Sequence, residues 1–503
     1  MASRDIDQIG IVGAGAMGAG IAQVALTGGL SVVLYDLDAA ARARAAAGIG
    51  ERLDRLAAKG QLDDPASAKA RLTLAGDLAD LAACPVVIEA VVENLAVKRE
   101  LFTALEKIVS PYAVLASNTS SLPIGSIALA CAHRERVVGL HFFNPVPLMR
   151  LVEVILPEGT RPGLGAELSA LCRRMGRTPV EVKDTPGFLV NLGGRAFTQE
   201  ALHLVAEGVA QPAEIDAVMR DAWGFRMGPF ELMDLTGIDV NYPASRVIYE
   251  GFQDDPRLRT TALHRRLYED GKFGRKTRQG FYAYAEDGGV VAAPAAAEST
   301  VPAPDPLIPD RVFLAEPAEP LVRLLIAAGV EPIGHDDGAC PILAAPIAED
   351  CTDLALRLGI DHKRLVAVDL AMPDATRLTL MQAPGADPTS AAGVAALFAR
   401  IGRETTVIRD SPGFIGPRIV AMIANLGCAM AEMGLAGPAD IDLALQLGLN
   451  YPAGPFALAD RLGAGTVHEI LTQLRTVTGS DRYRPTPWLR RRAKLGLSAA
   501  TPA

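Results

Sequence analysis

The sequence predicts an α/β domain with a parallel, doubly wound sheet, followed by an all-α domain and then by a diverged copy of both. Three observations support this fold class. Short apolar runs alternate with helical patterns over residues 1–186. Long helical patterns then follow the Asp-Thr-Pro-Gly segment at 184–187, where proline and glycine end the preceding element. The heptapeptide KDTPGFL at 183–189 recurs as RDSPGFI at 409–415, which indicates an internal duplication.

The first domain begins with two strands separated by a helix. Ile9–Val12 is an apolar run that ends in glycines, Ala16–Leu26 has helical spacing, and Ser31–Tyr35 is rich in β-branched residues. A long helix rich in alanine and arginine follows from about Ala39 to Lys59. Pro85–Val92 is continuously apolar, as expected of a strand buried on both faces. The remaining expected elements are a helix over Leu95–Val109 and strands over Val114–Ala116 and Arg136–Phe143.

Composition and the repeat predict the domain boundaries. Residues 285–310 consist largely of alanine, proline and glycine, and such a segment cannot bury a core. Beyond it, LNYPAGPFALAD at 449–460 resembles GFRMGPFELMD at 224–234. We therefore expect an α/β Rossmann domain at 1–186, a helical domain at 187–284, a linker at 285–310, a degenerate Rossmann-like domain at 311–409 and a second helical domain at 410–503.

Composition also excludes several classes of function. The chain has 503 residues, of which 50% are hydrophobic and 21% charged, and its formal net charge is −9. This charge, without a basic block, argues against nucleic-acid binding, because phosphates would be repelled. The sequence shows neither an apolar stretch of about 20 residues typical of a membrane span nor a secretory signal. The six cysteines are scattered and the seven histidines form no ligand-spaced cluster, so we expect reduced thiols, a cytoplasmic location and no metal site.

The segment Gly13–Gly18 reads GAGAMG and fits G-x-G-x-x-G between a predicted strand and a predicted helix. The first glycine allows a tight turn, the second lets a pyrophosphate approach the helix N-terminus, and the third lets helix and strand pack closely. Asp36 ends the second strand, where a carboxylate accepts from both ribose hydroxyls and repels a 2′-phosphate, so NAD is favoured over NADP. The alternative is a glycine-rich turn beside a solvated aspartate. The cofactor residues expected here are Gly13, Gly15, Ala16, Met17, Gly18 and Asp36.

Five motifs occur in the order and at the spacing of one known family: GAGAMGAGIAQVAL at 13–26, AVVENLAVK at 90–98, SNTSS at 117–121, HFFNPVPLMRLVEV at 141–154 and DTPGFLVN at 184–191. Residues from about 5 to 284 thereby resemble the L-3-hydroxyacyl-CoA dehydrogenases. The duplicated layout resembles the longer bacterial members linked to phenylacetate-type aromatic catabolism. The resemblance implies NAD-dependent oxidation of (S)-3-hydroxyacyl-CoA to 3-oxoacyl-CoA, in fatty acid β-oxidation or in aromatic breakdown.

His141 ends a predicted strand, in the crevice where doubly wound sheets bind ligands. Histidine suits a general base for the substrate hydroxyl because it exchanges protons near neutral pH. Glu153 lies in the apolar run LVEVI, where a buried carboxylate needs a partner, and pairing with His141 would orient the imidazole. The resemblance assigns these two roles. The alternatives are a structural histidine and an edge-strand glutamate facing water.

The resemblance adds Ser120 and Asn191 as donors to the substrate oxygen while it changes between hydroxyl and carbonyl. Asn191 belongs to the predicted helical domain, so catalysis is expected to need both domains at one cleft. SNTSS could instead be a turn and helix cap. The further contacts that the resemblance implies are Glu93, Lys98, Ser120, Asn144 and Lys276 for the cofactor, and Lys59 and Arg52 for CoA, with Arg52 standing where the family has a serine. Solvated surface charges are the alternative for these lysines.

The second copy is expected to lack activity, because it has no G-x-G-x-x-G and its equivalents of the catalytic residues differ. They are Asp369 for His141, Leu380 for Glu153 and Pro417 for Asn191. We expect this half to serve packing, in a homodimer or as an internal pseudo-dimer within a monomer.

Two other functions remain open from the sequence. One is a 3-hydroxy acid dehydrogenase on the same scaffold that acts without CoA, against which Lys59 weighs weakly. The other is a nucleotide-binding structural protein with reduced catalysis, against which the intact first-half motifs weigh. Arg195 follows Asn191 by one helical turn and is a candidate partner for a terminal carboxylate, such as that of 3-hydroxyadipyl-CoA. A surface or interdomain salt bridge is the alternative for Arg195.

Overall fold

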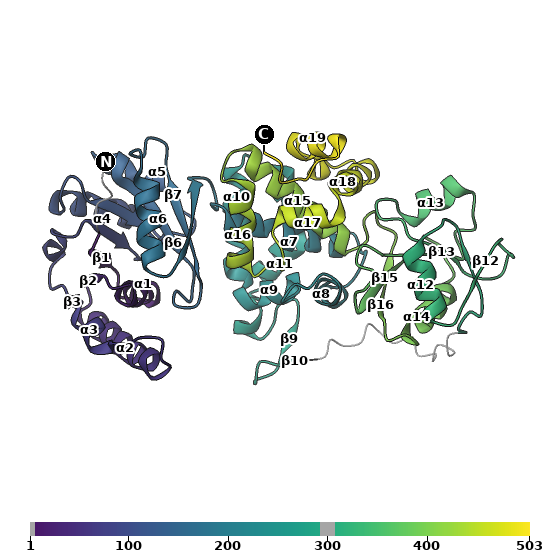
Figure 1. The fold of residues 1–503 in the computed structure, drawn as a ribbon, viewed down its shortest axis with the longest axis horizontal. Helices are drawn as coiled ribbons and strands as arrows, with labels where there is room; N and C mark the ends of the chain where they lie inside the picture. Colours follow the sequence, from purple (N-terminus) through teal and green to yellow (C-terminus); the bar gives the residue numbers. More distant parts are fainter. Residues whose placement is uncertain (1–5, 292–306, 503) are drawn as a thin grey trace. The chain divides into compact units, whose positions relative to one another are not determined.

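The computed structural model describes residues 6–291 and 307–502 of the chain (Figure 1). The chain divides into two compact units. The first unit comprises Met1–Leu192 and Met433–Leu449, and the second comprises Gly193–Glu432 and Asn450–Ala503. Each unit therefore combines segments from both halves of the sequence. The division into five segments in chain order remains a prediction.

The first unit is built on an eight-stranded sheet of order β3-β2-β1-β4-β5-β6-β7-β8. Its strands are β1 (Gln8–Val12), β2 (Ser31–Tyr35), β3 (Leu72–Leu74), β4 (Val86–Glu89), β5 (Val114–Ser117), β6 (Val137–Phe142), β7 (Leu151–Leu156) and β8 (Thr178–Lys183). The predicted α/β class is confirmed, and neighbouring strands pair in parallel except β6 and β7. Residues 143–150 join these two strands, and so short a connection cannot complete the crossover that parallel pairing needs.

Helices pack against this sheet and form a hydrophobic core with it. They are α1 (Ala16–Thr27), α2 (Ala39–Ala58), α3 (Pro65–Ala70), α4 (Leu95–Ile108), α5 (Ile124–Ala128) and α6 (Leu164–Arg174). Alternate strand residues such as Ile9 and Ile11 pack with the buried faces of α1, α2 and α6. Strand β4 ends at Glu89 rather than at Val92, because the Glu89 carboxylate accepts from the Val91 backbone N–H and closes a turn.

The two helical segments have matching elements. The first holds α7 (Val190–Ala206), α8 (Pro212–Asp221), α9 (Pro229–Thr236), α10 (Ile238–Gly251) and α11 (Ala262–Glu269), and the second holds α15 (Gly416–Glu432), α16 (Pro438–Leu449), α17 (Pro455–Leu462), α18 (Ala464–Thr478) and α19 (Pro487–Leu495). A short hairpin of β9 (Ala283–Tyr284) and β10 (Val290–Val291) reaches into the predicted linker, of which residues 292–306 lie outside the described residues. Within the described ranges, no helix is both long and apolar enough to span a membrane.

A second sheet of order β12-β11-β13-β14-β15-β16 lies in the second unit. Its elements are β11 (Val312–Leu314), α12 (Glu319–Ala327), β12 (Pro332–Ile333), β13 (Ile342–Ala344), α13 (Cys351–Leu358), β14 (Leu365–Val368), β15 (Arg377–Gln382), α14 (Pro388–Ala399) and β16 (Glu404–Arg409). Strands β14 and β15 run antiparallel, as β6 and β7 do, and the Asp369 N–H donates to the Thr379 carbonyl. The alignment of Glu153 with Leu380 is therefore wrong, and Thr379 is the equivalent. The hairpin between the opposed positions is shorter in the second copy, which spacing alone did not reveal.

The repeated D-x-P-G-F segment adopts the same structure in both copies. Phe188 and Phe414 share a φ of +49°. The carboxylate of Asp184 accepts backbone N–H groups at the start of α5, and that of Asp410 accepts the equivalent groups at the start of α13. This common turn, with its carboxylate at a helix N-terminus, confirms the internal duplication.

Two equivalent helices are exchanged between the copies. Helix α16, from the second helical segment, belongs to the first unit and packs on β7 and β8. Helix α8, from the first helical segment, packs on β15 in the second unit, where Asp221 pairs with Arg377 at 2.8 Å. Each sheet thus carries a helix that comes from the other copy.

Candidate active site

The glycine loop between β1 and α1 leaves space for a pyrophosphate. Gly13 has a φ of +107°, and a Cβ there would lie 2.5 Å from the Ala90 carbonyl oxygen. A Cβ at Gly18 would lie 1.8 Å from the Gly13 carbonyl oxygen, so helix and loop are in direct contact. A Cβ at Gly15, by contrast, would meet none of the described residues within 4 Å. Ala16 and Met17 form the first turn of α1, whose N–H groups lack partners within the helix and favour an anion.

Asp36 follows β2 directly and is half-buried. Its Oδ2 accepts from the Ala14 N–H at 2.7 Å and its Oδ1 from the Asp38 N–H at 2.9 Å. These bonds hold the carboxylate beside the glycine loop and leave lone pairs for ribose hydroxyls. The open loop and the oriented carboxylate therefore fit NAD.

The antiparallel register sets His141 on β6 directly opposite Glu153 on β7. The His141 Nδ1 lies 2.6 Å from the Glu153 Oε2, and the two side chains are 6% and 0% exposed. The interpretation of Glu153 as an edge residue facing water is wrong, because β7 lies between β6 and β8. Since Nδ1 is committed to the carboxylate, Nε2 is the ring nitrogen left for a substrate.

Glu153 is also held by the start of α7. Its Oε1 accepts from the backbone N–H groups of Leu189 and Val190, each at 2.9 Å. A carboxylate is acceptor-only, so it satisfies all three donors, and the helix N-terminus favours its negative charge. These bonds offset the cost of complete burial and fix the face that Glu153 presents to His141.

Asn191 comes directly after Val190, and its Nδ2 donates to the Ser120 carbonyl at 3.0 Å. The structure therefore brings together both residues expected at the substrate oxygen. The Ser120 N–H in turn donates to the Glu93 Oε1 at 3.1 Å. The SNTSS segment also forms the turn considered as an alternative, since the Thr119 hydroxyl accepts from a backbone N–H three residues on.

A buried ion cluster supports this turn. The Lys98 Nζ, on a side chain 1% exposed, lies 2.6 Å from the Glu89 Oε1 and 3.3 Å from the Glu93 Oε2. The interpretation of Lys98 as a solvated surface charge is therefore wrong. Desolvation by itself would raise the pKa of Glu93, but the hydrogen bond from Thr119 and the charge of Lys98 outweigh it and lower that pKa below its ordinary value.

Two residues of this site were not predicted from the sequence. Glu89 lies in the apolar run PVVIEAVV, and the reasoning applied to Glu153, that a carboxylate in such a run needs a partner, could have identified it. The Asn118 Oδ1 accepts from the Phe142 N–H at 2.8 Å and joins the ends of β5 and β6. Its signal, an asparagine directly after a buried strand, is weak.

The remaining predicted contact residues lie in several different elements. Asn144 follows β6 and precedes a cis peptide bond. Arg52 donates to a glutamine on α1 at 2.5 Å, and Lys59 ends helix α2 as an exposed residue. Lys276 belongs to the second unit, where its Nζ lies 2.7 Å from an Asp239 carboxylate oxygen.

Arg195 is buried in the second unit, at 9% exposed. Its Nη1 donates to the Ser245 hydroxyl at 2.8 Å. Burial lowers the pKa of Arg195 to about 10, so the guanidinium stays charged at neutral pH. This environment is not that of a surface salt bridge.

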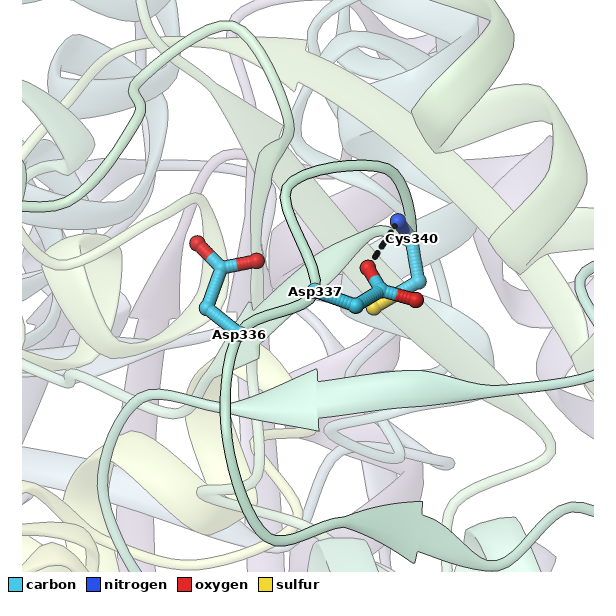
Figure 2. A group of neighbouring side chains, drawn as sticks. All are labelled: Asp336, Asp337 and Cys340. Carbon is cyan, nitrogen blue, oxygen red and sulfur yellow. Dashed lines mark hydrogen bonds between the residues drawn. The ribbon is translucent and has the colours of Figure 1, made fainter.

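Among the described residues, one group of metal-ligating types comes together: Asp336, Asp337 and Cys340, with ligand atoms within 4.8 Å of one another (Figure 2). Asp336 binds Arg364 through both carboxylate oxygens, at 2.7 and 2.8 Å. Asp337 accepts from the Cys340 backbone N–H at 2.9 Å. These bonds account for the cluster without an ion, and we assign no metal site to it.

Comparisons with known proteins match these features. A family model described as the NAD binding domain of 3-hydroxyacyl-CoA dehydrogenase matches residues 8–185, and that of its C-terminal domain matches residues 187–284 and again 413–502. The 3-hydroxyadipyl-CoA dehydrogenase of Escherichia coli K12 is 36% identical, over 98% of each chain. The human mitochondrial hydroxyacyl-coenzyme A dehydrogenase is 40% identical, over 56% of this chain and 91% of its own. The crystal structure of 3-hydroxybutyryl-CoA dehydrogenase from Escherichia coli K12 has a TM-score of 0.83 at 34% identity and covers 98% of this chain and 99% of its own.

Proposed function

The chain belongs to the 3-hydroxyacyl-CoA dehydrogenase family and is an NAD-dependent dehydrogenase of 3-hydroxyacyl-CoA, and we propose that His141 is the general base of its reaction. One observation supports this proposal above the others. A single hydrogen-bonded network links His141 and Glu153 to the start of α7, and from Asn191 it continues through Ser120 to Glu93. Residues expected at the proton, the oxygen and the cofactor are thus held in one arrangement.

His141 takes the proton of the substrate hydroxyl at Nε2. Its Nδ1–H donates to Glu153, which keeps the lone pair on Nε2 and stabilises the imidazolium that forms. Ser120 and Asn191 donate to the substrate oxygen as it becomes a carbonyl. Gly13–Gly18 and Asp36 would hold NAD, which would supply the hydride acceptor for the same carbon.

The substrate is proposed to be an (S)-3-hydroxyacyl-CoA, with Lys59 and Arg52 contacting the CoA moiety. The name of the Escherichia coli relative suggests an acyl chain with a terminal carboxylate, as in 3-hydroxyadipyl-CoA. Rates on adipyl-type and butyryl-type substrates, measured for the natural chain and for Arg195→Ala, test this point. If the ratio of the adipyl-type rate to the butyryl-type rate is the same in Arg195→Ala as in the natural chain, Arg195 does not contribute to substrate selection.

The second half is proposed to act as an internal partner in a pseudo-dimer. Besides the exchanged helices, a buried ion cluster joins the two helical segments within the second unit. Glu200 on α7 accepts from Arg418 on α15 at 2.7 Å and from Arg482 at 2.9 Å, and these side chains are 0%, 1% and 3% exposed.

The proposed base is tested with His141→Gln, measuring NADH oxidation with acetoacetyl-CoA by absorbance. We expect NADH binding to persist and most turnover to be lost, whereas normal turnover would refute the assignment. His133→Gln is a matched control, because that histidine is exposed on the same unit. Turnover of free acetoacetate by the natural chain would favour a dehydrogenase that acts without CoA.

A further inference from the structure

A helix from the second half packs against the residues that hold Glu153. Gly448 lies in the last turn of α16, and a Cβ there would lie 2.9 Å from both Val190 methyl carbons and 3.1 Å from the Leu151 Cδ2. Carbon atoms in ordinary contact are about 3.5–4.0 Å apart. The side chains of Val190 and Leu151 are 1% and 0% exposed, so neither has free space to retreat into.

Both neighbours of Gly448 are directly connected to Glu153. Val190 supplies one of the backbone N–H groups that bind the Glu153 Oε1, at 2.9 Å. Leu151 begins β7, the strand that carries Glu153 opposite His141. A displacement at Gly448 therefore reaches the catalytic pair through the strand and through the helix start.

The segment before α16 is itself anchored to the sheet of the first unit. The Lys183 N–H, at the end of β8, donates to the Leu435 carbonyl at 3.2 Å, and the Lys183 Nζ donates to the Met433 carbonyl at 3.3 Å. The helix then packs on β7 and β8. Its position relative to Glu153 is thus held at more than one point.

We propose that Gly448 is a positioning residue for the His141–Glu153 pair, and that helix α16 makes the catalytically inactive half a working part of the active site. This inference rests on the proposed function, because the pair must be catalytic for its position to matter. The physical reason is the lack of space, since only a residue without a side chain lets α16 approach Val190 without moving its N–H away from Glu153.

The test is Gly448→Ala, assayed with acetoacetyl-CoA and NADH. The added methyl group must move Val190 by about half an ångström to reach ordinary contact, and misplacement by about 1 Å at a catalytic group costs about a hundredfold in rate. We expect kcat to fall about tenfold while the dissociation constant for NADH stays unchanged, because the glycine loop is not touched. The double variant Gly448→Ala/Val190→Ala removes the two nearest methyl groups in conflict, leaves the contact with the Leu151 Cδ2 at 3.1 Å, and is expected to recover most of kcat.

Gly465→Ala is the matched control. It makes the same change in helix α18 of the second half, at a glycine whose added Cβ would have no neighbour within 4 Å in the described part of the chain, and kcat should not change. An unchanged kcat in Gly448→Ala, or a double variant no better than the single one, would overturn the proposal.

If Gly448→Ala does not fold, a second variant tests the same contact. Val190→Ile adds a methyl group from the other side of the same contact and is also expected to lower kcat, and an unchanged kcat would overturn the proposal. Inactivity of the natural chain on acetoacetyl-CoA would instead contradict the proposed function.

Discussion

Glu153→Gln replaces one oxygen of the proposed catalytic pair by an NH2 group, and the surrounding hydrogen bonds predict its effect on the His141 ring. The two backbone N–H groups of Leu189 and Val190 point at the Oε1 position, so the amide oxygen of the glutamine must face them. Its NH2 group is then directed at the His141 Nδ1, 2.6 Å from the present Oε2. Nδ1 becomes an acceptor, the ring proton moves to Nε2, and the atom that should take the substrate proton is already protonated.

The expected loss follows from this tautomer change. In the analogous Ser-His-Asp arrangement, replacing the carboxylate by an amide costs about 10⁴-fold in kcat with the geometry intact, or about 5 kcal/mol of barrier. We expect a fall of about 10³- to 10⁴-fold in kcat for oxidation of (S)-3-hydroxybutyryl-CoA by NAD, the direction in which Nε2 takes the proton, with NADH affinity unchanged. Glu181→Gln, an exposed carboxylate on the neighbouring β8, is the matched control. A fall of less than about tenfold in Glu153→Gln would show that Glu153 does not set the tautomer.

Further predictions concern the glycine loop and the buried ion cluster around Glu200. Gly15→Ala should leave thermal stability unchanged but weaken NADH binding, measured by fluorescence titration, because its Cβ occupies open space that the pyrophosphate needs. Gly18→Ala should instead lower the unfolding temperature, because its Cβ would lie 1.8 Å from the Gly13 carbonyl oxygen. Glu200→Gln should lower the free energy of unfolding by about 3 kcal/mol in urea titrations, since it takes the Glu200 carboxylate from two buried arginines, of which Arg418 keeps its pair with Glu207 at 2.8 Å. Burial opposes ionisation of Glu200, but Arg482 and Arg418 lower its pKa from 4.5 to about 2, so this stability is present above pH 4.5 and is lost as pH falls through about 2; a variant with the natural acid-unfolding profile would contradict the assignment.

The elements that the sequence analysis placed in the first half could be predicted closely because their signals are local, whereas α3, β3, α5, α6 and β8 were not predicted. Helix α1 and strand β2 differ from their expected bounds by no more than one residue, since apolar periodicity and glycine breaks mark them. The end of β4 was missed, because it depends on a hydrogen bond between the Glu89 side chain and the backbone. The equivalent of Glu153 in the second copy was misaligned, because strand register depends on pairing across the sheet and not on spacing along the chain.

The sequence by itself determined which residue types are candidates for the chemistry: the glycine loop, the aspartate after the second strand, a histidine at the end of a strand and a glutamate in an apolar run. Each is a local sequence pattern, and few functions require that residue type in that local context. The tertiary structure alone decided that β6 and β7 run antiparallel, which sets His141 opposite Glu153, and that the ammonium of Lys98 is buried between two carboxylates. It also decided that a helix from the second copy packs against Val190 and Leu151, because close packing depends on which surfaces meet in space, and residues 190 and 448 are far apart in the chain.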